Sequence, residues 1–516
     1  MTQFFGKSAR ARFCRFGLLA AVLSGLGGCQ VKPEPLTTET LGLQADDLAT
    51  NAMAEQAAPT RPISLYEAFA RALKYNLDHR VELMQIAVRV NELQLANYQM
   101  LPSLVANSGY AGRDRYAASS SVSILSGRQS LEPSYSSDRN VGVGDLTLSW
   151  NILDFGLSYV RAKQAADQAL IAEEVRRRVV SRIIEDVRTA YWRAITSERL
   201  ISRLRALEGR TERAIGDARK LYADRQTSPI SALTYERELI EIKRESQRVE
   251  GELKIARSQL AALMNLPPDS TFRLSAGHDS NVGVPLGLSG RELVRVALQN
   301  RSEIREVLYR SRINEQEAEA ALLELLPGIN LLVGGNADSN SLLYNSNWVG
   351  WGARASWNAM RLFQYPERSN LIGAQDALLR QRALALTMAV ITQVHVSRVR
   401  HAHTVKELKT AADFNRVQRS LLQQMRAAAV TEKISEHTLI REEMNALIAE
   451  VKYDLAHAAL QNARANVYAS LGLDTFETVA IRRMSVVDLA QALRRTWIGE
   501  GSVVPARAAS AVAAAK

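Results

Sequence analysis

Cysteine is almost missing from this sequence of 516 residues, because Cys14 and Cys29 are the two present and both lie near the N-terminus. A disulfide framework in the rest of the chain is therefore excluded. Beyond the first 28 residues no apolar run of about 20 residues occurs, which excludes a transmembrane helix. Any entry into a membrane must use strands or an attached lipid.

Motifs that carry chemistry are missing as well. The sequence has no glycine-rich phosphate loop, no G-x-S-x-G and no H-E-x-x-H. Of its seven histidines, His401 and His403 would project about 200° apart on a helix, so they cannot chelate a metal from one face. Carboxylate pairs such as Glu173-Glu174 lie in charged helical runs, which is typical of a solvated face. We therefore expect no enzyme activity, no cofactor and no metal site.

Positive charge is in modest excess. The formal net charge is +11, and four basic residues among the first 28 leave +7 for the rest of the chain. This charge is spread along the sequence and is not gathered into a stripe with interleaved aromatic residues, which argues against a nucleic-acid partner. With 47% hydrophobic and 23% charged residues, the composition is that of an ordered protein.

The N-terminus has the layout of a secretory leader. A basic segment precedes an apolar run that ends in the lipobox Leu26-Gly27-Gly28-Cys29. This resembles bacterial lipoproteins, in which the cysteine becomes the lipidated, palmitate-bearing first residue; an ordinary cleaved signal peptide is the alternative. The resemblance implies a lipid on Cys29 and, because Gln30 and not aspartate follows it, delivery to the outer membrane.

Two long stretches without proline dominate the chain. The first runs from about Tyr159 to Gln226 and the second from about Glu367 to Ala428. At about 1.5 Å per residue, each predicts a helix of roughly 100 Å, far longer than an average helix. In the first stretch, hydrophobic residues recur every seven positions, which is coiled-coil spacing; these are Val180, Val187, Ala194 and Ile201.

Short alternating segments precede each long stretch. From Leu146 to Ile152 apolar and polar residues alternate, and a similar alternation runs from Val349 to Asn358. A strand that meets lipid on one face and water on the other needs this pattern, although a soluble sandwich strand would show it too. Four tryptophans, namely Trp150, Trp348, Trp351 and Trp357, are candidates for an interfacial aromatic belt, with ordinary packing as the alternative.

The pattern occurs twice. Leu101-Pro102 corresponds to Leu326-Pro327, and Ser149-Trp150-Asn151 corresponds to Ser356-Trp357-Asn358. The sequence therefore predicts a tandem duplication of helix, strand pair, long helix and helix. The predicted divisions are a lipoprotein signal peptide over 1–28, an extended tether over 29–62, a first repeat over 63–270, a linker over 271–288, a second repeat over 289–474 and a C-terminal tail over 475–516 with a short amphipathic helix near Val486–Arg495.

This duplicated pattern resembles the TolC-type outer-membrane efflux family over residues 63–474. The resemblance is carried by the Leu-Pro before each strand pair, by Leu148–Gly156 ahead of the first long stretch and by the closing Leu263-Met264-Asn265-Leu266. It implies a mainly α-helical membrane protein with a smaller β part. Three chains, each giving four strands, would share a twelve-stranded outer-membrane β-barrel that continues into a long α-helical periplasmic tunnel.

The resemblance also implies a function. The chain is expected to be the outer-membrane channel of a tripartite efflux or secretion system, a passive duct coupled through a periplasmic adaptor protein to an inner-membrane pump or transporter. The alternative is a lipid-anchored coiled-coil scaffold of the cell envelope that conducts nothing. The strands distinguish the two functions, because a scaffold has no need of lipid-facing strands.

The turns between the long helices are the expected periplasmic tips, at Tyr222–Ala232 and Arg426–Thr438. In the family these tips contact the adaptor and constrict the pore, and many members carry a glycine there with aspartates just beyond it. This sequence departs from that pattern because the first turn has no glycine and hydroxyl residues stand where aspartates are expected. Our candidate adaptor-contact and gate residues are Asp224, Arg225, Thr227, Ser231, Thr234, Glu432, Lys433 and Glu436.

Overall fold

The computed structural model describes residues 34–53, 56, 59–130, 132–223, 228–267, 270–275, 289–431, 434–473 and 484–498. The chain forms two units, Met1–Glu55 and Gln56–Lys516. In the first unit, helix α2 (Thr38–Met53) begins after Thr37, whose hydroxyl accepts a hydrogen bond from the Thr40 amide (3.2 Å). The expectation of an extended tether is therefore wrong over this stretch, where good helix formers continue without proline.

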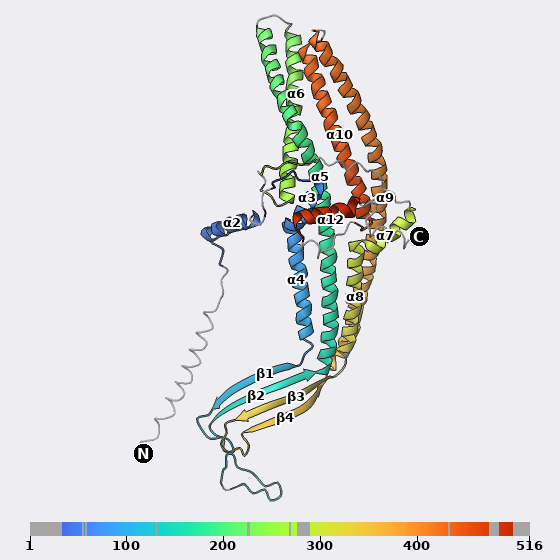
Figure 1. Cartoon of the computed structure of the whole chain (residues 1–516). Helices are drawn as coiled ribbons and strands as arrows, with labels where there is room; N and C mark the ends of the chain where they lie inside the picture. Colours follow the sequence, from blue (N-terminus) through green and yellow to red (C-terminus); the bar gives the residue numbers. More distant parts are fainter. Residues whose placement is uncertain are drawn as a thin grey trace, which may run out of the picture. The chain divides into compact units, whose positions relative to one another are not determined.

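In the larger unit the same order of elements occurs twice (Figure 1). Each half has two consecutive helices, a strand pair, a very long helix and a shorter returning helix. The first half comprises α3 (Leu65–Tyr75), α4 (Leu77–Tyr98), β1 (Ser103–Gly112), β2 (Asn140–Asn151), α5 (Ile152–Ala223) and α6 (Pro229–Leu263). The second comprises α7 (Gly290–Asn300), α8 (Ser302–Leu323), β3 (Gly328–Asp338), β4 (Asn347–Ser356), α9 (Met360–Val430) and α10 (Glu436–Ser470).

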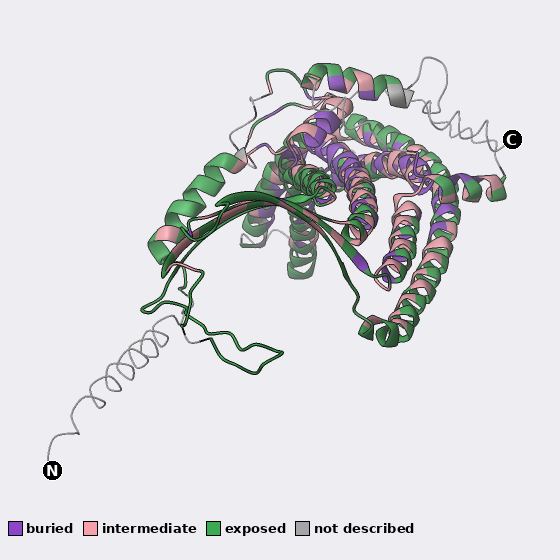
Figure 2. Cartoon of the chain, turned by 90° about the horizontal axis from the view of Figure 1, so that it is seen from below, coloured by how far each residue is buried: buried purple, intermediate pink, exposed green. Residues whose placement is uncertain are grey.

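The strands form one antiparallel sheet in the order β1-β2-β3-β4. Register places Leu148 opposite both Leu104 and Val333, and Val333 opposite Trp351. The helices that adjoin the strands keep this order, because α4 packs on α5, α5 on α8, and α8 on α9. A curved sheet therefore continues directly into a wall of four helices (Figures 1 and 2).

The long helices are longer than the sequence predicted. Helix α5 has 72 residues and α9 has 71, or about 105 Å each. Helix α5 begins directly after β2, whereas three residues separate β4 from α9, which includes Pro366 near its start instead of beginning after it. Pro366 is the seventh residue of α9, beyond the first four amides that lack an intrahelical partner, so the helix continues through it at the loss of the hydrogen bond to the carbonyl of Leu362.

The single helix predicted at the start of the first repeat is in fact two helices. Asn76 separates α3 from α4 with an extended backbone (φ −60°, ψ 127°), and its side chain accepts a hydrogen bond from the amide of His79 (3.3 Å). In the second half Arg301 separates α7 from α8 with nearly the same angles (φ −66°, ψ 132°). The break thus occurs at the equivalent position of both repeats, 225 residues apart.

The core lies in the middle of the helical part. The central stretch of α5 packs against α3 and the end of α6, and the C-terminal helix α12 (Val486–Ile498) packs on α3 and lies across the long helices (Figure 1). Phe69, Tyr191 and Leu260 are buried there, together with Leu489 and Leu493 of α12. The structure therefore confirms the short amphipathic helix predicted in the tail.

Both returning helices end in a left-handed turn. Asn265 (φ 58°) follows α6, and Gly472 (φ 68°) follows α10 at the equivalent position. The next amide in each case donates back into the last turn of the helix, from Leu266 to the carbonyl of Ala261 (2.8 Å) and from Leu473 to that of Tyr468 (3.1 Å). This is the Schellman arrangement, which satisfies carbonyls that the helix end leaves free.

Candidate functional site

One face of the sheet is apolar and exposed. Leu146, Leu148 and Trp150 of β2 are 52%, 42% and 39% exposed, whereas the alternating polar residues between them are half-buried. Cross-strand neighbours on the same face extend it over all four strands; they include Leu104, Leu331, Val333, Val349 and Trp351. Nothing in the described part of the chain covers this face.

The opposite face of the sheet is polar and rich in glycine. Thr147 and Ser149 of β2 share it with Asn107 and Asp145, whose side chains form a hydrogen bond (3.1 Å). A side chain at Gly334 would collide with Thr147, since an added Cβ would lie 2.7 Å from its hydroxyl. The sheet therefore separates an apolar surface from a hydrophilic one, as the alternation in the sequence predicts.

Both lateral edges of the chain lack a partner. Among the described residues, β1 and β4 each pair on one side only. Helix α4, at the β1 edge of the wall, exposes an apolar stripe of heptad spacing, made of Leu77, Val81, Met84, Val88 and Leu95. Helix α9, at the β4 edge, exposes a second stripe made of Met388, Val396, Val399, Phe414, Val417 and Leu421. Such stripes are typical of helices that pack on another helix.

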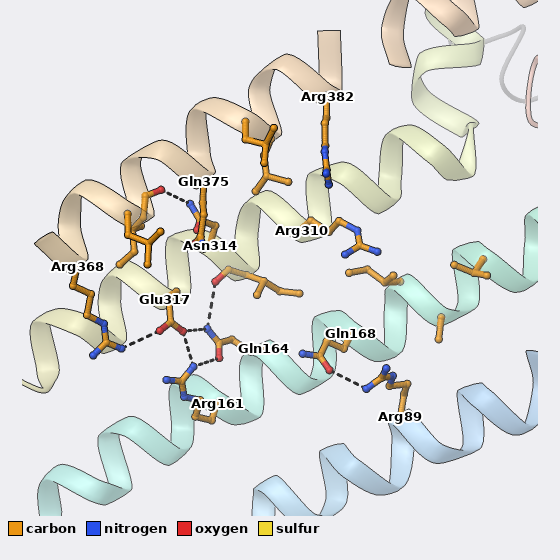
Figure 3. A pocket seen from close by; sticks show the side chains of 18 of the residues that line it. Arg89, Arg161, Gln164, Gln168, Arg310, Asn314, Glu317, Arg368, Gln375 and Arg382 are labelled. Atoms are coloured by element: carbon orange, nitrogen blue, oxygen red, sulfur yellow. Dashed lines mark hydrogen bonds and ion pairs between the residues drawn. The ribbon is translucent and has the colours of Figure 1, made fainter. Parts of the chain in front are cut away.

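A hollow of about 980 Å³ lies on the helical wall near the sheet, lined by α4, α5, α8 and α9 (Figure 3). Five arginines line it, but Glu317 is the only acidic residue that does so within the described ranges. Glu317 is bound by Arg161 (2.5 Å), Gln164 (3.1 Å) and Arg368 (3.0 Å). Burial raises the pKa of Glu317, but these hydrogen bonds outweigh it and hold the pKa at about 2.

The two turns at the far end of the long helices lie within the predicted tip stretches. Helix α5 ends at Ala223 and α6 begins at Pro229, while α9 ends at Val430 and α10 begins at Glu436. Of the candidate residues, Ser231 and Thr234 are exposed near the start of α6, and Glu436 lies 3.7 Å from Arg210 of α5. Outside the described residues lie Cys29, Asp224, Arg225, Thr227, Glu432 and Lys433.

Below the tips, one buried and one half-buried carboxylate join the two helical hairpins. Glu450 of α10 is 6% exposed and contacts Arg203 of α5 (2.7 Å) and Arg419 of α9 (3.1 Å). One heptad away along the same helices, Glu443 contacts Arg210 of α5 and Arg426 of α9. We name these two sets the Arg-Glu-Arg triads. Each ties hairpin α5–α6 to hairpin α9–α10 through charge.

A third contact between the hairpins lies closer to the tips. His437 of α10 lies 3.0 Å from the carboxylate of Glu238 on α6, and its ring meets Tyr235 edge-on with a centroid separation of 4.4 Å. Partial burial lowers the pKa of His437, and the nearby Glu238 opposes this effect without reversing it. At neutral pH the contact therefore involves an uncharged imidazole.

The described residues contain neither a membrane-crossing helix nor a cluster of metal ligands. None of the helices in the described ranges combines the length and apolar character that a membrane crossing requires. No group of three or more His, Cys, Asp or Glu side chains in these ranges is arranged to hold a metal ion.

Comparison with known proteins gives matches to solved structures. No protein-family description matches the chain, and no curated sequence matches it. The CmeC outer-membrane channel of Campylobacter jejuni aligns over 90% of this chain and 97% of its own, with 12% identity and a TM-score of 0.63. The MtrE outer-membrane channel of Neisseria gonorrhoeae, in its open state, aligns over 79% and 89%, with 16% identity and a TM-score of 0.60. CusC, described as forming a transmembrane channel, aligns over 82% and 96%, with 17% identity and a TM-score of 0.60.

The chain therefore has the fold of outer-membrane channel proteins. This confirms, at the level of fold, the TolC-type resemblance that the sequence predicted. These three solved structures are all described as channels.

Sequence reasoning missed the Arg-Glu-Arg triads and the basic hollow. Each depends on side chains that are far apart in the sequence, such as Arg203 and Glu450. A signal was nevertheless present, because Arg203 and Arg210, Glu443 and Glu450, and Arg419 and Arg426 are all seven residues apart.

Proposed function

We propose that this chain is the outer-membrane channel of a tripartite efflux or secretion system. It acts as a passive duct from the periplasm to the exterior. The observation that carries the proposal is a four-stranded sheet with an exposed apolar face, open edges and direct continuation into a helical wall. An apolar face of this kind fits lipid, and the polar face fits an aqueous lumen.

The functional form is a homotrimer. Four strands are too few to close a barrel around a channel, so several copies must pair edge to edge, β1 of one copy with β4 of the next. The unpartnered stripes on α4 and α9 lie at the same two edges and would be covered in the same step. Three copies give twelve strands, which agrees with the family resemblance.

The remaining parts have consistent roles. Helices of about 105 Å greatly exceed a bilayer core of about 30 Å, so they extend into the periplasm. Their tips meet a periplasmic adaptor that links the duct to an inner-membrane transporter, with Asp224, Arg225, Thr227, Ser231, Thr234, Glu432, Lys433 and Glu436 as contact and gate candidates. Cys29 carries the lipid that holds the mature N-terminus at the outer membrane.

Two neighbouring residues of β2 test the proposal. Leu148 lies on the apolar face and Thr147 on the polar face. Arginine in place of Leu148 would face lipid, at a cost of about 2–4 kcal/mol in each copy, and should prevent stable insertion. Thr147→Arg should leave insertion and trimer mass unchanged but alter single-channel conductance in a planar bilayer.

The outcomes separate the duct from the scaffold. Discrete conductance steps from a trimer, lost in Leu148→Arg and changed in Thr147→Arg, would support the duct. A chain that stays monomeric without detergent after removal of Cys29, with both variants behaving alike, would refute it.

A further inference from the structure

The basic hollow on the helical wall lies on the side that would face the lumen. Helix α5 provides the orientation, because Trp150 on the apolar face of the sheet packs edge-on against Phe155 with a centroid separation of 5.8 Å. Side chains turn by about 100° per residue along a helix, so Tyr159 and Lys163 continue the Phe155 side. The residues of α5 that line the hollow lie on the opposite side; they are Arg161, Gln164, Gln168, Ile171, Ala172 and Val175.

The charge of the hollow is unbalanced. Glu317 is shared by Arg161 and Arg368, and Arg368 also binds Glu324. Arg89 and Arg310 pair with Glu92 and Glu306, which do not line the hollow. Arg382 makes no hydrogen bond or ion pair with any described residue. Arg161 and Arg368 point toward Glu317 within the hollow (Figure 3), whereas the other counter-charges, Glu92, Glu306 and Glu324, are not among the residues that line it.

Apolar side chains lie between these cations. Leu371 and Leu378 of α9 line the hollow and are 58% and 52% exposed. A surface that presents guanidinium donors beside exposed aliphatic groups suits solutes with both an anionic and an apolar part.

We infer that this hollow forms, in the assembled duct, a basic belt that favours the passage of anionic solutes. The inference rests on the proposed function and names the class of cargo. Three copies of the chain place the arginine set around the lumen three times at one level. In a narrow aqueous space with low-dielectric walls, such a belt raises the local concentration of anions and lowers that of cations.

The test measures ion selectivity in the full mature trimer. The reversal potential under a KCl gradient gives the permeability of chloride relative to potassium, which should exceed one in the wild type. Arg382→Glu should lower this ratio several-fold, because the side chain is unpaired and lines the hollow. The matched control is Lys163→Glu, which makes the same charge change on α5, two residues from Arg161 but on the side of the helix that does not line the hollow, and should leave the ratio unchanged.

A second measurement serves if the duct conducts poorly. Binding of tripolyphosphate to the detergent-solubilised trimer, followed by calorimetry, should weaken several-fold in Arg382→Glu and not in Lys163→Glu. Channels that prefer potassium, or equal effects of the two variants in both measurements, would overturn the inference and leave the duct intact. Absence of any conductance from the trimer, even with loosened tips, would instead count against the proposed function.

Discussion

The two longest helices are nearly equal in length and occupy equivalent places in the two repeats, yet they are buried very differently. Helix α5 lies inside the helical wall with neighbours on both sides, and its buried apolar residues run along most of its length. Helix α9 lies at one edge and buries only Val390, Val394 and Leu422 among its described apolar side chains. Its other large apolar residues are mostly exposed. Helix α5 thus lies at the centre of the chain, whereas α9 presents an exposed apolar surface on which a second copy could pack.

This difference separates the contacts that fold the single chain from those that would assemble several chains. The apolar residues of α5 are covered by helices of the same chain, whereas those of α9 would be covered by a neighbouring copy. Stability of the single chain therefore depends mostly on α5, and assembly depends mostly on α9 and α4. Substitutions that compare the two helices should separate folding from association.

The largest expected effect comes from a matched pair of substitutions. Val187 of α5 is fully buried and Val399 of α9 is 69% exposed. Val187→Asp places an unpaired carboxylate in the core and should cost about 4 kcal/mol or more, enough to abolish folding. Val399→Asp should leave the helical circular dichroism of the chain intact while removing the trimer from native mass spectra. Equal loss of helix in both variants would contradict the division of roles.

A smaller effect is expected at the Arg-Glu-Arg triads, where the two long helices are joined through α10. Glu450→Gln removes the carboxylate that Arg203 and Arg419 share, which Arg199 also approaches (3.5 Å). Because these arginines are about half exposed, the loss of stability should be about 1–3 kcal/mol. Because the two hairpins would then be less firmly joined, the channel should also spend a larger fraction of time in conducting states.

The control for this prediction is Glu252→Gln. Glu252 pairs with Arg248 on the exposed surface of α6, where its side chain is 63% exposed. Loss of this surface pair should change the melting temperature little. A similar shift in the two variants would argue that the triads do not tie the hairpins.

The smallest effect concerns pH. His79 is buried in the α5 region, and its Nδ1 donates a hydrogen bond to the carbonyl of Leu73 (2.7 Å). Burial lowers the pKa of His79, opposed in part by that carbonyl and by Glu173, while Arg176 lowers the pKa further. Below about pH 6.5 the unfolded chain therefore binds more protons than the folded one, so stability is complete at neutral pH and falls with acidification.

Thermal unfolding at pH 7.5 and pH 5.5 checks this sign. His79→Gln keeps a donor for Leu73 but cannot titrate, so the difference between the two pH values should shrink. If the difference in melting temperature between the two pH values is unchanged in His79→Gln, another group causes the loss of stability in acid, for instance the more exposed His437.

Much of the fold could be predicted from the sequence because its signals are local. Alternation along β2, heptads along α5 and the double occurrence of Leu-Pro each lie within short segments. The break at Asn76 was missed because one extended residue between two helices leaves the hydrophobic pattern almost unchanged. The exposure of α9 could not be predicted, since whether a stripe is covered depends on which helix lies beside it.

The left-handed turns that follow α6 and α10 differ between the two repeats. At Gly472 an added Cβ would lie 2.7 Å from the backbone of Asn300, in a turn that already disfavours side chains, whereas Asn265 holds the same left-handed backbone with a side chain present. Glycine is thus compatible with the first turn, but asparagine is not compatible with the second. A single exchange therefore works in one direction: Asn265→Gly keeps the first turn, whereas Gly472→Asn would bring a side chain against the backbone of Asn300.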